Sequence, residues 1–288
     1  MTCQSDNQIN LRDGRRLGYA EFGDPRGKPV LFFHGYPGSR WDGAETGHAA
    51  ERVGVRLIAP DRPGMGLSDY QPKRRLLDWP TDVLELASAL GLERFAVIGY
   101  SGGGPYALAC ASQLDTRLSA VGVIAGIGPL TEPGAVDGMV KNNVRLFQLA
   151  RRTPWLLRLI FSLNRRMDSL KLLQAAVPQM PAVDQAVMRQ PGVLAGMAKD
   201  YSEAFRQGAR GVVHEGALYA SEWGFKLGEV TRPVRLWQGE QDTNVPAALG
   251  RFQARHLPDC QATFYPADGH ISIIVNHAAE ILTALSPS

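Results

Sequence analysis

The chain has 288 residues, of which 44% are hydrophobic and 20% are charged, and its formal net charge at pH 7 is +3. This length and hydrophobic content allow a substantial buried core, in one large domain or two modest ones. The three cysteines, Cys3, Cys110 and Cys260, are widely scattered. They favour reduced thiols and lack the spacing of metal ligands, so no metal site is predicted.

The N-terminal residues 1–8 are polar, with neither a basic start nor an apolar stretch, so no secretory signal is visible. No uninterrupted apolar run reaches membrane-spanning length. We therefore expect a soluble, cytoplasmic protein without an integral membrane segment. Nucleic acid is not an expected partner, because aromatic residues are not interleaved with the basic ones and no known binding motif occurs.

Strand-like and helix-like stretches alternate in the first part of the chain. Residues 30–33 and 95–98 are short apolar runs typical of buried strands, and helical patterns occur near residues 76–90 and 104–114. Because this alternation continues to about residue 127, it predicts an α/β fold with a mostly parallel sheet.

The most informative stretch is Gly99-Tyr100-Ser101-Gly102-Gly103, which follows an apolar run and precedes a helix-like one. A serine on such a sharp turn between strand and helix exposes its hydroxyl and adopts a strained backbone conformation. The small neighbours let strand and helix pass closely. Ser101 is therefore the candidate nucleophile.

From residue 128 to residue 225 strand-like runs disappear and helical spacing replaces them. A helical insertion between two parts of one sheet is interpreted as a lid over the site. This interpretation divides the chain into a first core part at residues 1–127, a lid at residues 128–225 and a second core part at residues 226–288.

Two features of the insertion bear on binding. Residues 155–161 are apolar nearly all round, which favours burial between lid and core, with a contact of Trp155 and Phe161 to substrate as the alternative. Residues 141–171 hold eight basic residues and one acidic residue, Asp168. A solvated face is the simplest explanation, and an anionic substrate, a membrane surface or an acidic partner are the others.

A serine hydroxyl needs a base and a group that holds the base. His270 lies in a turn after the apolar residues 262–264, and Asp242 follows the strand-like residues 234–237. The carboxyl ends of parallel strands gather at one edge of a sheet, so Ser101, Asp242 and His270 can converge there. Glu240 is the nearest alternative carboxylate.

The developing oxyanion needs two backbone N–H donors, one after the nucleophile and one from an early loop. Gly102 is the first candidate. Tyr36 is the second, because residues 34–40 form a loop bounded by glycine and proline after a short strand. His34 is a weaker candidate for the base, since its place at a strand end beside Gly35 favours a role in bracing the loop.

Together these motifs resemble the α/β-hydrolase superfamily, in its single-domain, lidded branch, over essentially the whole chain. The resemblance rests on residues 34–38 as the oxyanion loop, residues 99–103 as the nucleophile elbow, Asp242 in the acid turn and His270 in the late histidine loop. It implies a doubly wound, mostly parallel sheet with an inserted helical lid. The serine points away from members with an aspartate nucleophile.

The resemblance implies hydrolysis of a small to medium, largely apolar carboxylic ester, lactone or thioester through an acyl-enzyme, with no cofactor. Trp41 in the core loops is a further candidate for substrate contact, beside Trp155 and Phe161. Carbon–carbon bond hydrolysis on the same residues and a ligand-sensing protein that signals through its lid remain open. An aminopeptidase or amidase is another alternative, which would need carboxylates to bind a substrate ammonium, such as Glu203, Glu215 or Glu222.

Overall fold

The computed structural model describes residues 4–114 and 116–286. Eight strands form one sheet in the order β1-β2-β4-β3-β5-β6-β7-β8. Their bounds are β1 Gln4–Asn10, β2 Arg16–Gly23, β3 Lys28–Phe33, β4 Val55–Pro60, β5 Phe95–Tyr100, β6 Leu118–Ile124, β7 Val234–Gly239 and β8 Cys260–Tyr265. Because the sheet contains the strand-like runs found in the sequence, the predicted α/β class is confirmed.

The sheet is parallel from β4 through β3, β5, β6 and β7 to β8, and antiparallel at the other edge, where β2 pairs with both β1 and β4. The sequence reading did not identify β1 and β2. A parallel arrangement brings the carboxyl ends of β3, β5, β7 and β8 to one edge, and the loops after these strands therefore meet.

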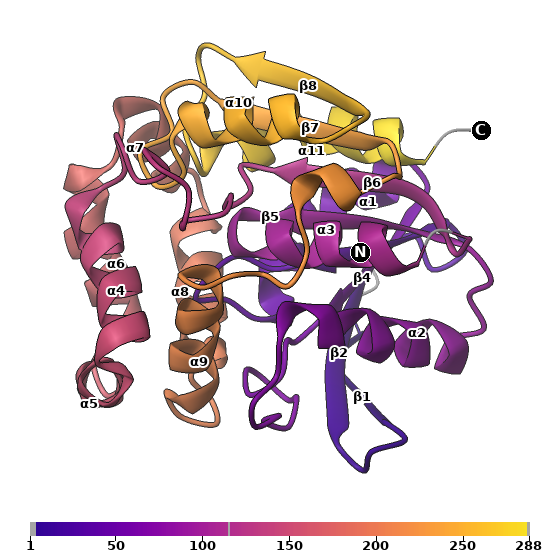
Figure 1. Cartoon of the computed structure of the whole chain (residues 1–288), viewed down its shortest axis with the longest axis horizontal. Helices are drawn as coiled ribbons and strands as arrows, with labels where there is room; N and C mark the ends of the chain where they lie inside the picture. The colour runs from indigo at the N-terminus through magenta and orange to yellow at the C-terminus, as the bar shows by residue number, and fades with distance from the viewer. Residues whose placement is uncertain (1–3, 115, 287–288) are drawn as a thin grey trace.

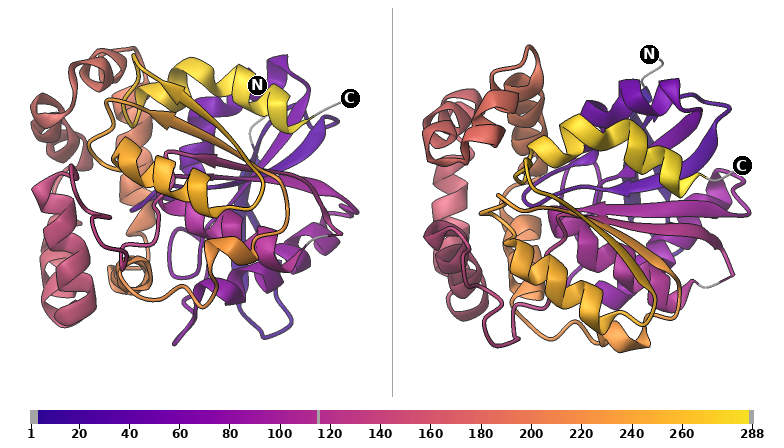
Figure 2. Two further views of the ribbon diagram at one scale, coloured as in Figure 1. Left: turned by 45° about the horizontal axis from the view of Figure 1, so that its top comes forward. Right: turned by 90° about the horizontal axis from the view of Figure 1, so that it is seen from above.

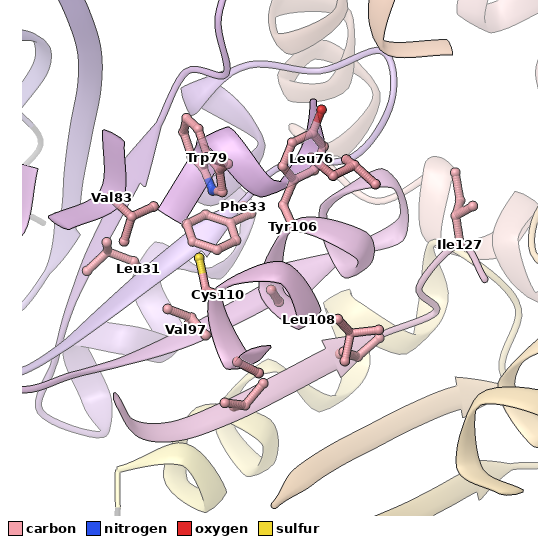
Figure 3. Close-up of a cluster of buried hydrophobic side chains, with 14 of the residues drawn as sticks. Leu31, Phe33, Leu76, Trp79, Val83, Val97, Tyr106, Leu108, Cys110 and Ile127 are labelled. Carbon is pink, nitrogen blue, oxygen red and sulfur yellow. The ribbon is translucent and has the colours of Figure 1, made fainter. Parts of the chain in front are cut away.

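Helices cover both faces of the sheet (Figures 1 and 2). On one face α2 (Trp79–Ala89), α3 (Gly104–Gln113) and α10 (Ala247–His256) enclose a core that includes Phe33, Trp79 and Tyr106 (Figure 3). On the other face α1 (Gly47–Arg52) and α11 (Ser272–Leu285) enclose a second core. The sheet is thus doubly wound, with a buried core on each face.

Residues 128–225, here called the helical insertion, lie between β6 and β7 and gather at one side of the sheet (Figures 1 and 2). The insertion contains no strand. Its helices are α4 Lys141–Arg152, α5 Pro154–Asn164, α6 Ser169–Ala176, η4 Val177–Gln179, α7 Ala182–Met188, α8 Val193–Ala204 and α9 Arg210–Tyr219. The other short turns of helix are η1 Arg40–Thr46, η2 Leu76–Asp78, η3 Ser101–Gly103 and η5 Leu227–Glu229.

The prediction that residues 155–161 are buried between lid and core is wrong for the outward face of α5. Leu157 and Phe161 are buried in a cluster with Met65 of the core and with Phe205 and Val212 of the insertion. Trp155, however, is 69% exposed. A helix at the margin of the insertion has neighbours on one side only, and its other side faces solvent although its residues are apolar.

Candidate active site

A cavity of about 260 Å³ opens where the loops after β3, β5, β7 and β8 meet the helical insertion. Ser101, His270 and Tyr36 line it. The insertion supplies most of the apolar lining, including Leu146 and Phe147 from α4. Polar groups from the sheet edge therefore face an apolar chamber, which is the usual composition of a small-molecule site.

Ser101 follows β5 directly and has a φ of +51°, in the left-handed region that residues with a side chain rarely adopt. The turn is tight: a Cβ atom on Gly99 would collide with the Gly103 carbonyl, and one on Gly103 would collide with the Phe33 carbonyl. Strained backbone at a serine on a sharp turn between strand and helix is the geometry that a nucleophile elbow requires.

The structure brings Ser101, His270 and Asp242 into one hydrogen-bonded line. The Ser101 Oγ lies 2.9 Å from His270 Nε2, and His270 Nδ1 lies 2.7 Å from the Asp242 carboxylate. All three side chains are buried. The arrangement can move a proton from the hydroxyl to the imidazole while the carboxylate stabilises the cation that forms.

The loop after β7 fixes the orientation of Asp242. Its Oδ1 atom accepts hydrogen bonds from the backbone N–H groups of Asn244 and Val245, each at 2.8 Å. Its Oδ2 atom faces His270 and also accepts from Gln238 Nε2 at 3.1 Å. Burial lowers the pKa of the His270 imidazole, but the neighbouring Asp242 carboxylate raises it more, so its pKa lies above the ordinary value.

The two predicted oxyanion donors lie side by side. A Cβ atom built on Gly102 would be 3.2 Å from the Tyr36 nitrogen, which places the two backbone segments in contact beside Ser101. Among the described residues no acceptor takes the Tyr36 N–H group. The Tyr36 hydroxyl donates to the Val212 carbonyl at 3.0 Å, so this residue also ties the early loop to the helical insertion.

His34 braces the loop. It is fully buried, its Nδ1 donates to the Gly35 carbonyl at 2.9 Å, and its Nε2 accepts the Arg62 backbone N–H at 3.2 Å. Burial and the nearby Arg62 cation lower the pKa of this imidazole well below its ordinary value. Both ring nitrogens are occupied by backbone groups, which is compatible with the bracing role and leaves His270 as the candidate base beside Ser101.

A buried ion pair joins this loop to the insertion. The Arg62 guanidinium donates to Glu215 of α9 at 2.5 and 3.1 Å, and to the Gly35 carbonyl at 2.8 Å. Neither side chain of the pair is exposed to solvent. Burial raises the pKa of Glu215, but the cations of Arg62 and Arg74 outweigh it and hold the pKa at about 2.

We expect Glu215→Gln to lower the free energy of unfolding at pH 7 by about 3–5 kcal/mol, because the buried Arg62 charge loses its partner. The Glu215 carboxylate has a depressed pKa in the folded state, so its stabilising effect is present above the ordinary value of 4.5 and is lost as the pH falls toward about 2. Denaturant titrations at several pH values should therefore show wild type and variant converging in acid. Glu132→Gln, at an exposed position, is the matched control, and an equal loss of stability in that variant would contradict the assignment.

Asp184 of α7 is a residue that the sequence analysis missed. Its buried carboxylate accepts the backbone N–H groups of His270, Ile271 and Ser272 at 2.9, 3.1 and 2.9 Å. Backbone N–H groups at the start of a helix such as α11 have no acceptor within the helix. Asp184, a residue of the insertion, therefore caps the helix that follows His270. No sequence signal links residues this far apart.

The three aromatic residues suggested as substrate contacts do not line the cavity, which corrects that interpretation. Trp41 packs on Phe22 with the Lys199 ammonium over its ring. Trp155 faces solvent, and Phe161 is buried against Phe205. The cavity is lined instead by other apolar side chains of the insertion, namely Leu146, Phe147, Leu173, Met180 and Met197.

The three carboxylates proposed for an ammonium group also lie elsewhere. Glu203 pairs with Arg40, Glu215 pairs with Arg62, and Glu222 lines a separate cavity near η5. Two carboxylates that were not singled out, Asp42 and Asp200, do line the candidate site. Within the described ranges no cluster of histidine, cysteine, aspartate and glutamate could hold a metal ion, and no helix is both long and apolar enough to cross a bilayer.

Comparison with known proteins agrees with this fold. The family model described as alpha/beta hydrolase fold matches residues 28–277, and the chain belongs to this family. It is 32% identical over 280 residues to a bifunctional esterase/perhydrolase of Acinetobacter calcoaceticus, covering 91% of this chain and 92% of that protein. The enol-lactonase structure from Burkholderia xenovorans LB400 has a TM-score of 0.69 at 20% identity and covers 97% of this chain and 98% of its own. The chain therefore has the α/β-hydrolase fold.

Local similarity extends to a peptidase. A segment of 105 residues is 37% identical to a proline iminopeptidase of Xylella fastidiosa, which covers 34% of this chain and 32% of that protein. Several curated relatives are matched over only 32% to 56% of their length. Their activities are properties of those proteins, and the activity of this chain has to be argued from its own site.

Proposed function

We propose that this protein is a serine hydrolase that cleaves a small to medium, largely apolar carboxylic ester, lactone or thioester through an acyl-enzyme. The observation that carries the proposal is the line of hydrogen bonds from the strained Ser101 through His270 to Asp242, at 2.9 and 2.7 Å. Esterase and lactonase relatives that span nearly the whole chain support the same class of reaction.

In this mechanism the Ser101 Oγ attacks the substrate carbonyl and its proton passes to His270 Nε2. The Asp242 carboxylate holds the Nδ1 proton and stabilises the imidazolium. The N–H groups of Tyr36 and Gly102 donate to the oxyanion, where one such donor typically contributes about 3 kcal/mol. His270 then protonates the leaving oxygen or sulfur, and a water molecule activated by the same imidazole hydrolyses the acyl-enzyme.

The helical insertion acts as the lid in this proposal, between core parts at residues 1–127 and 226–288. Its apolar side chains form the chamber above Ser101, and a chamber of about 260 Å³ suits a small or medium acyl group. Closing such a cover excludes water from the charged intermediate. The substrate is thus a small molecule that enters between the lid and the sheet edge.

A fluorophosphonate probe together with a series of p-nitrophenyl esters from acetate to octanoate tests the proposal. We expect stoichiometric labelling of Ser101, identified by mass spectrometry of the labelled peptide, and turnover of several members of the series. A purified, folded protein that is neither labelled nor active on any ester would overturn the proposal. Tight saturable binding with negligible turnover would favour a ligand sensor instead.

A second candidate function is hydrolysis of a substrate that carries an ammonium group, as in an aminopeptidase or amidase. Asp42 and Asp200 both line the cavity beside Ser101. Asp42 accepts the Gly35 N–H at 2.6 Å, and Asp200 accepts the Ser39 N–H and hydroxyl, each at 2.7 Å. These bonds use one oxygen of each carboxylate, and no donor among the described residues binds the other oxygen.

The two carboxylates share one electrostatic environment. In the part of the chain that the structure describes, neither forms an ion pair with an arginine or lysine. Burial raises the pKa of Asp42 to about 6, and burial together with the Asp42 charge raises that of Asp200 well above its ordinary value. A substrate cation placed between them would restore both ionised forms, which favours an amine next to the scissile bond.

We expect Asp42→Asn and Asp200→Asn each to lower kcat/KM for amine-bearing esters and aminoacyl p-nitroanilides by about 10–100-fold relative to neutral esters, because a buried hydrogen bond to a charged group is lost. Asp137→Asn, at an exposed position, is the control. If both cavity variants leave the ratio of amine-bearing to neutral substrates unchanged, the second candidate fails and the ester proposal stands.

A further inference from the structure

The large apolar side chains that face solvent gather in one segment of the chain. In the described ranges the exposed large hydrophobic residues are Trp155 (69%), Leu159 (54%), Leu163 (57%), Met167 (57%) and Leu170 (37%). These five residues, three on α5, one in the bend after it (Met167) and one on α6 (Leu170), are called the α5 stripe. Single hydrophobic residues scattered over a surface are ordinary. These five residues, in contrast, all lie within sixteen consecutive positions, 155–170, and such a concentration of exposed apolar side chains marks an interaction site.

The helix periodicity explains how α5 can expose apolar residues on one face while its opposite face stays buried. Trp155, Leu159 and Leu163 are four residues apart and share one face of α5. Leu157 and Phe161 lie on the opposite face and are buried in the insertion. Helix α5 lies at the outer margin of the insertion in Figure 1.

Exposed basic residues lie within and beside the stripe in the sequence. Six exposed basic residues flank it in sequence, and this set is called the basic rim: Arg151, Arg152, Arg158, Arg165, Arg166 and Lys171. Among the described residues none of the six forms an ion pair. The one acidic residue of the segment, Asp168, uses its carboxylate to cap α6 by accepting the Leu170 and Lys171 N–H groups at 2.9 and 3.3 Å.

We propose that the α5 stripe and the basic rim dock the protein on an anionic lipid surface. An apolar helix face that carries a tryptophan and is bordered by arginines is the composition of helices that lie in the interface of a bilayer. The apolar side chains enter the boundary between headgroups and acyl chains, and the guanidinium groups bind lipid phosphates. Such docking is peripheral and needs no membrane-spanning segment.

Charge decides against a second copy of the chain as the occupant. A twofold contact would place the same patch on both sides of the interface, and the two basic rims would then face each other. Like charges across an interface oppose association, whereas a surface of phosphate groups complements the rim. Residues 141–171 hold eight basic residues and one acidic residue, whereas the formal net charge of the whole chain is only +3. The excess of positive charge is therefore concentrated in this segment.

Docking at α5 would act on the candidate active site through side chains that contact both, such as Leu146. Leu146 of α4 lines the cavity and also packs against the cluster that contains Leu157 and Phe161 of α5. An apolar substrate dissolved in the lipid would reach the cavity beneath the docked insertion. This last consequence rests on the proposed ester hydrolysis, whereas the docking itself does not.

Vesicle binding tests the docking without any measurement of activity. We expect wild type to sediment with vesicles of equal parts phosphatidylcholine and phosphatidylglycerol, and much less with pure phosphatidylcholine. Trp155 is the exposed one among the five tryptophans, three of which are less than 5% exposed. Its fluorescence should shift to the blue on binding, and Trp155→Phe should remove the shift while binding persists.

Two sets of substitutions separate the stripe from the rim. The double variant Leu159→Ser/Leu163→Ser should lower binding to the mixed vesicles about 10-fold or more, because two large side chains no longer enter the lipid. The triple variant Arg158→Gln/Arg165→Gln/Arg166→Gln should lower it about 100-fold, at roughly five-fold for each cation. All these positions are exposed, so folding should be unaffected, as circular dichroism can check.

A matched charge control is Arg12→Gln/Arg26→Gln/Arg52→Gln, which removes three exposed cations outside the insertion and should leave binding within about two-fold of wild type. Failure of wild type to bind the mixed vesicles overturns the proposal, as does equal binding by the stripe variant. Sedimentation velocity provides the other contradictory outcome: a wild-type dimer that the stripe variant converts to monomer would assign the patch to a second copy.

Discussion

Replacing Ser101 by alanine is expected to lower kcat for every ester substrate by about 10⁴-fold or more, since the variant has no nucleophile beside His270. Labelling by a fluorophosphonate should disappear in parallel. The side chain is small and Gly99 and Gly103 keep the tight turn, so the variant should fold like wild type. Activity and labelling of the purified variant are the two measurements, and circular dichroism verifies the fold.

Ser112→Ala is the matched control for this variant. Ser112 lies on α3, the helix that follows the elbow, and its hydroxyl donates to the Ala109 carbonyl at 2.9 Å, away from the cavity. It should retain activity and labelling. Substantial hydrolysis by Ser101→Ala would eliminate this residue as nucleophile and would redirect the search to a reaction driven by a water molecule held at His270.

Replacing Asp242 by asparagine is expected to lower turnover by about 10⁴-fold while the fold is preserved. The physical reason lies in the surrounding donors. The N–H groups of Asn244 and Val245 bind the Oδ1 atom, so an asparagine would direct its carbonyl oxygen to them and its amide NH2 toward His270 Nδ1. The imidazole would then carry its proton on Nε2 and could not accept one from Ser101.

The residual activity of this variant should also change with pH. His270 acts as a base only when neutral, so kcat/KM should rise as the pH increases through its pKa. The Asp242 carboxylate raises that pKa above the ordinary value. Its removal should move the rising limb to lower pH. Glu240→Gln is the control, because Glu240 pairs with Arg251 on the surface; a steep loss there and full activity in Asp242→Asn would exchange the two assignments.

The agreement between sequence and structure is best where the signal is local. The strand at residues 95–98 and the helix near residues 104–114 correspond to β5 and α3. Helix α4 ends at Arg152 and α5 begins at Pro154, where a proline occupies the first turn of the new helix. In each case the residue pattern acts on the backbone within a few positions, through alternation of apolar residues, helix periodicity or the fixed φ of proline.

The sequence-based predictions failed for features that depend on contacts between distant segments of the chain. The polar strand β1 was not identified, because its order comes from pairing with β2 and not from an apolar pattern. The α5 stripe has a spacing of four residues that is visible in the sequence. Helix α5 has apolar residues on two opposite faces, however, and which of these faces is buried depends on where the neighbouring helices lie.

The sequence by itself determined the α/β class, the elbow at Ser101, and the chain order of Ser101, Asp242 and His270, because glycine-bounded turns and apolar periodicities are local features. Only the tertiary structure decided what surrounds these residues. Asp42 and Asp200 line the cavity, and Asp184 of the insertion accepts the backbone N–H group of His270. The outer face of α5 is exposed to solvent. Contacts of this kind join residues far apart in the chain, and only the folded backbone sets the distance between them.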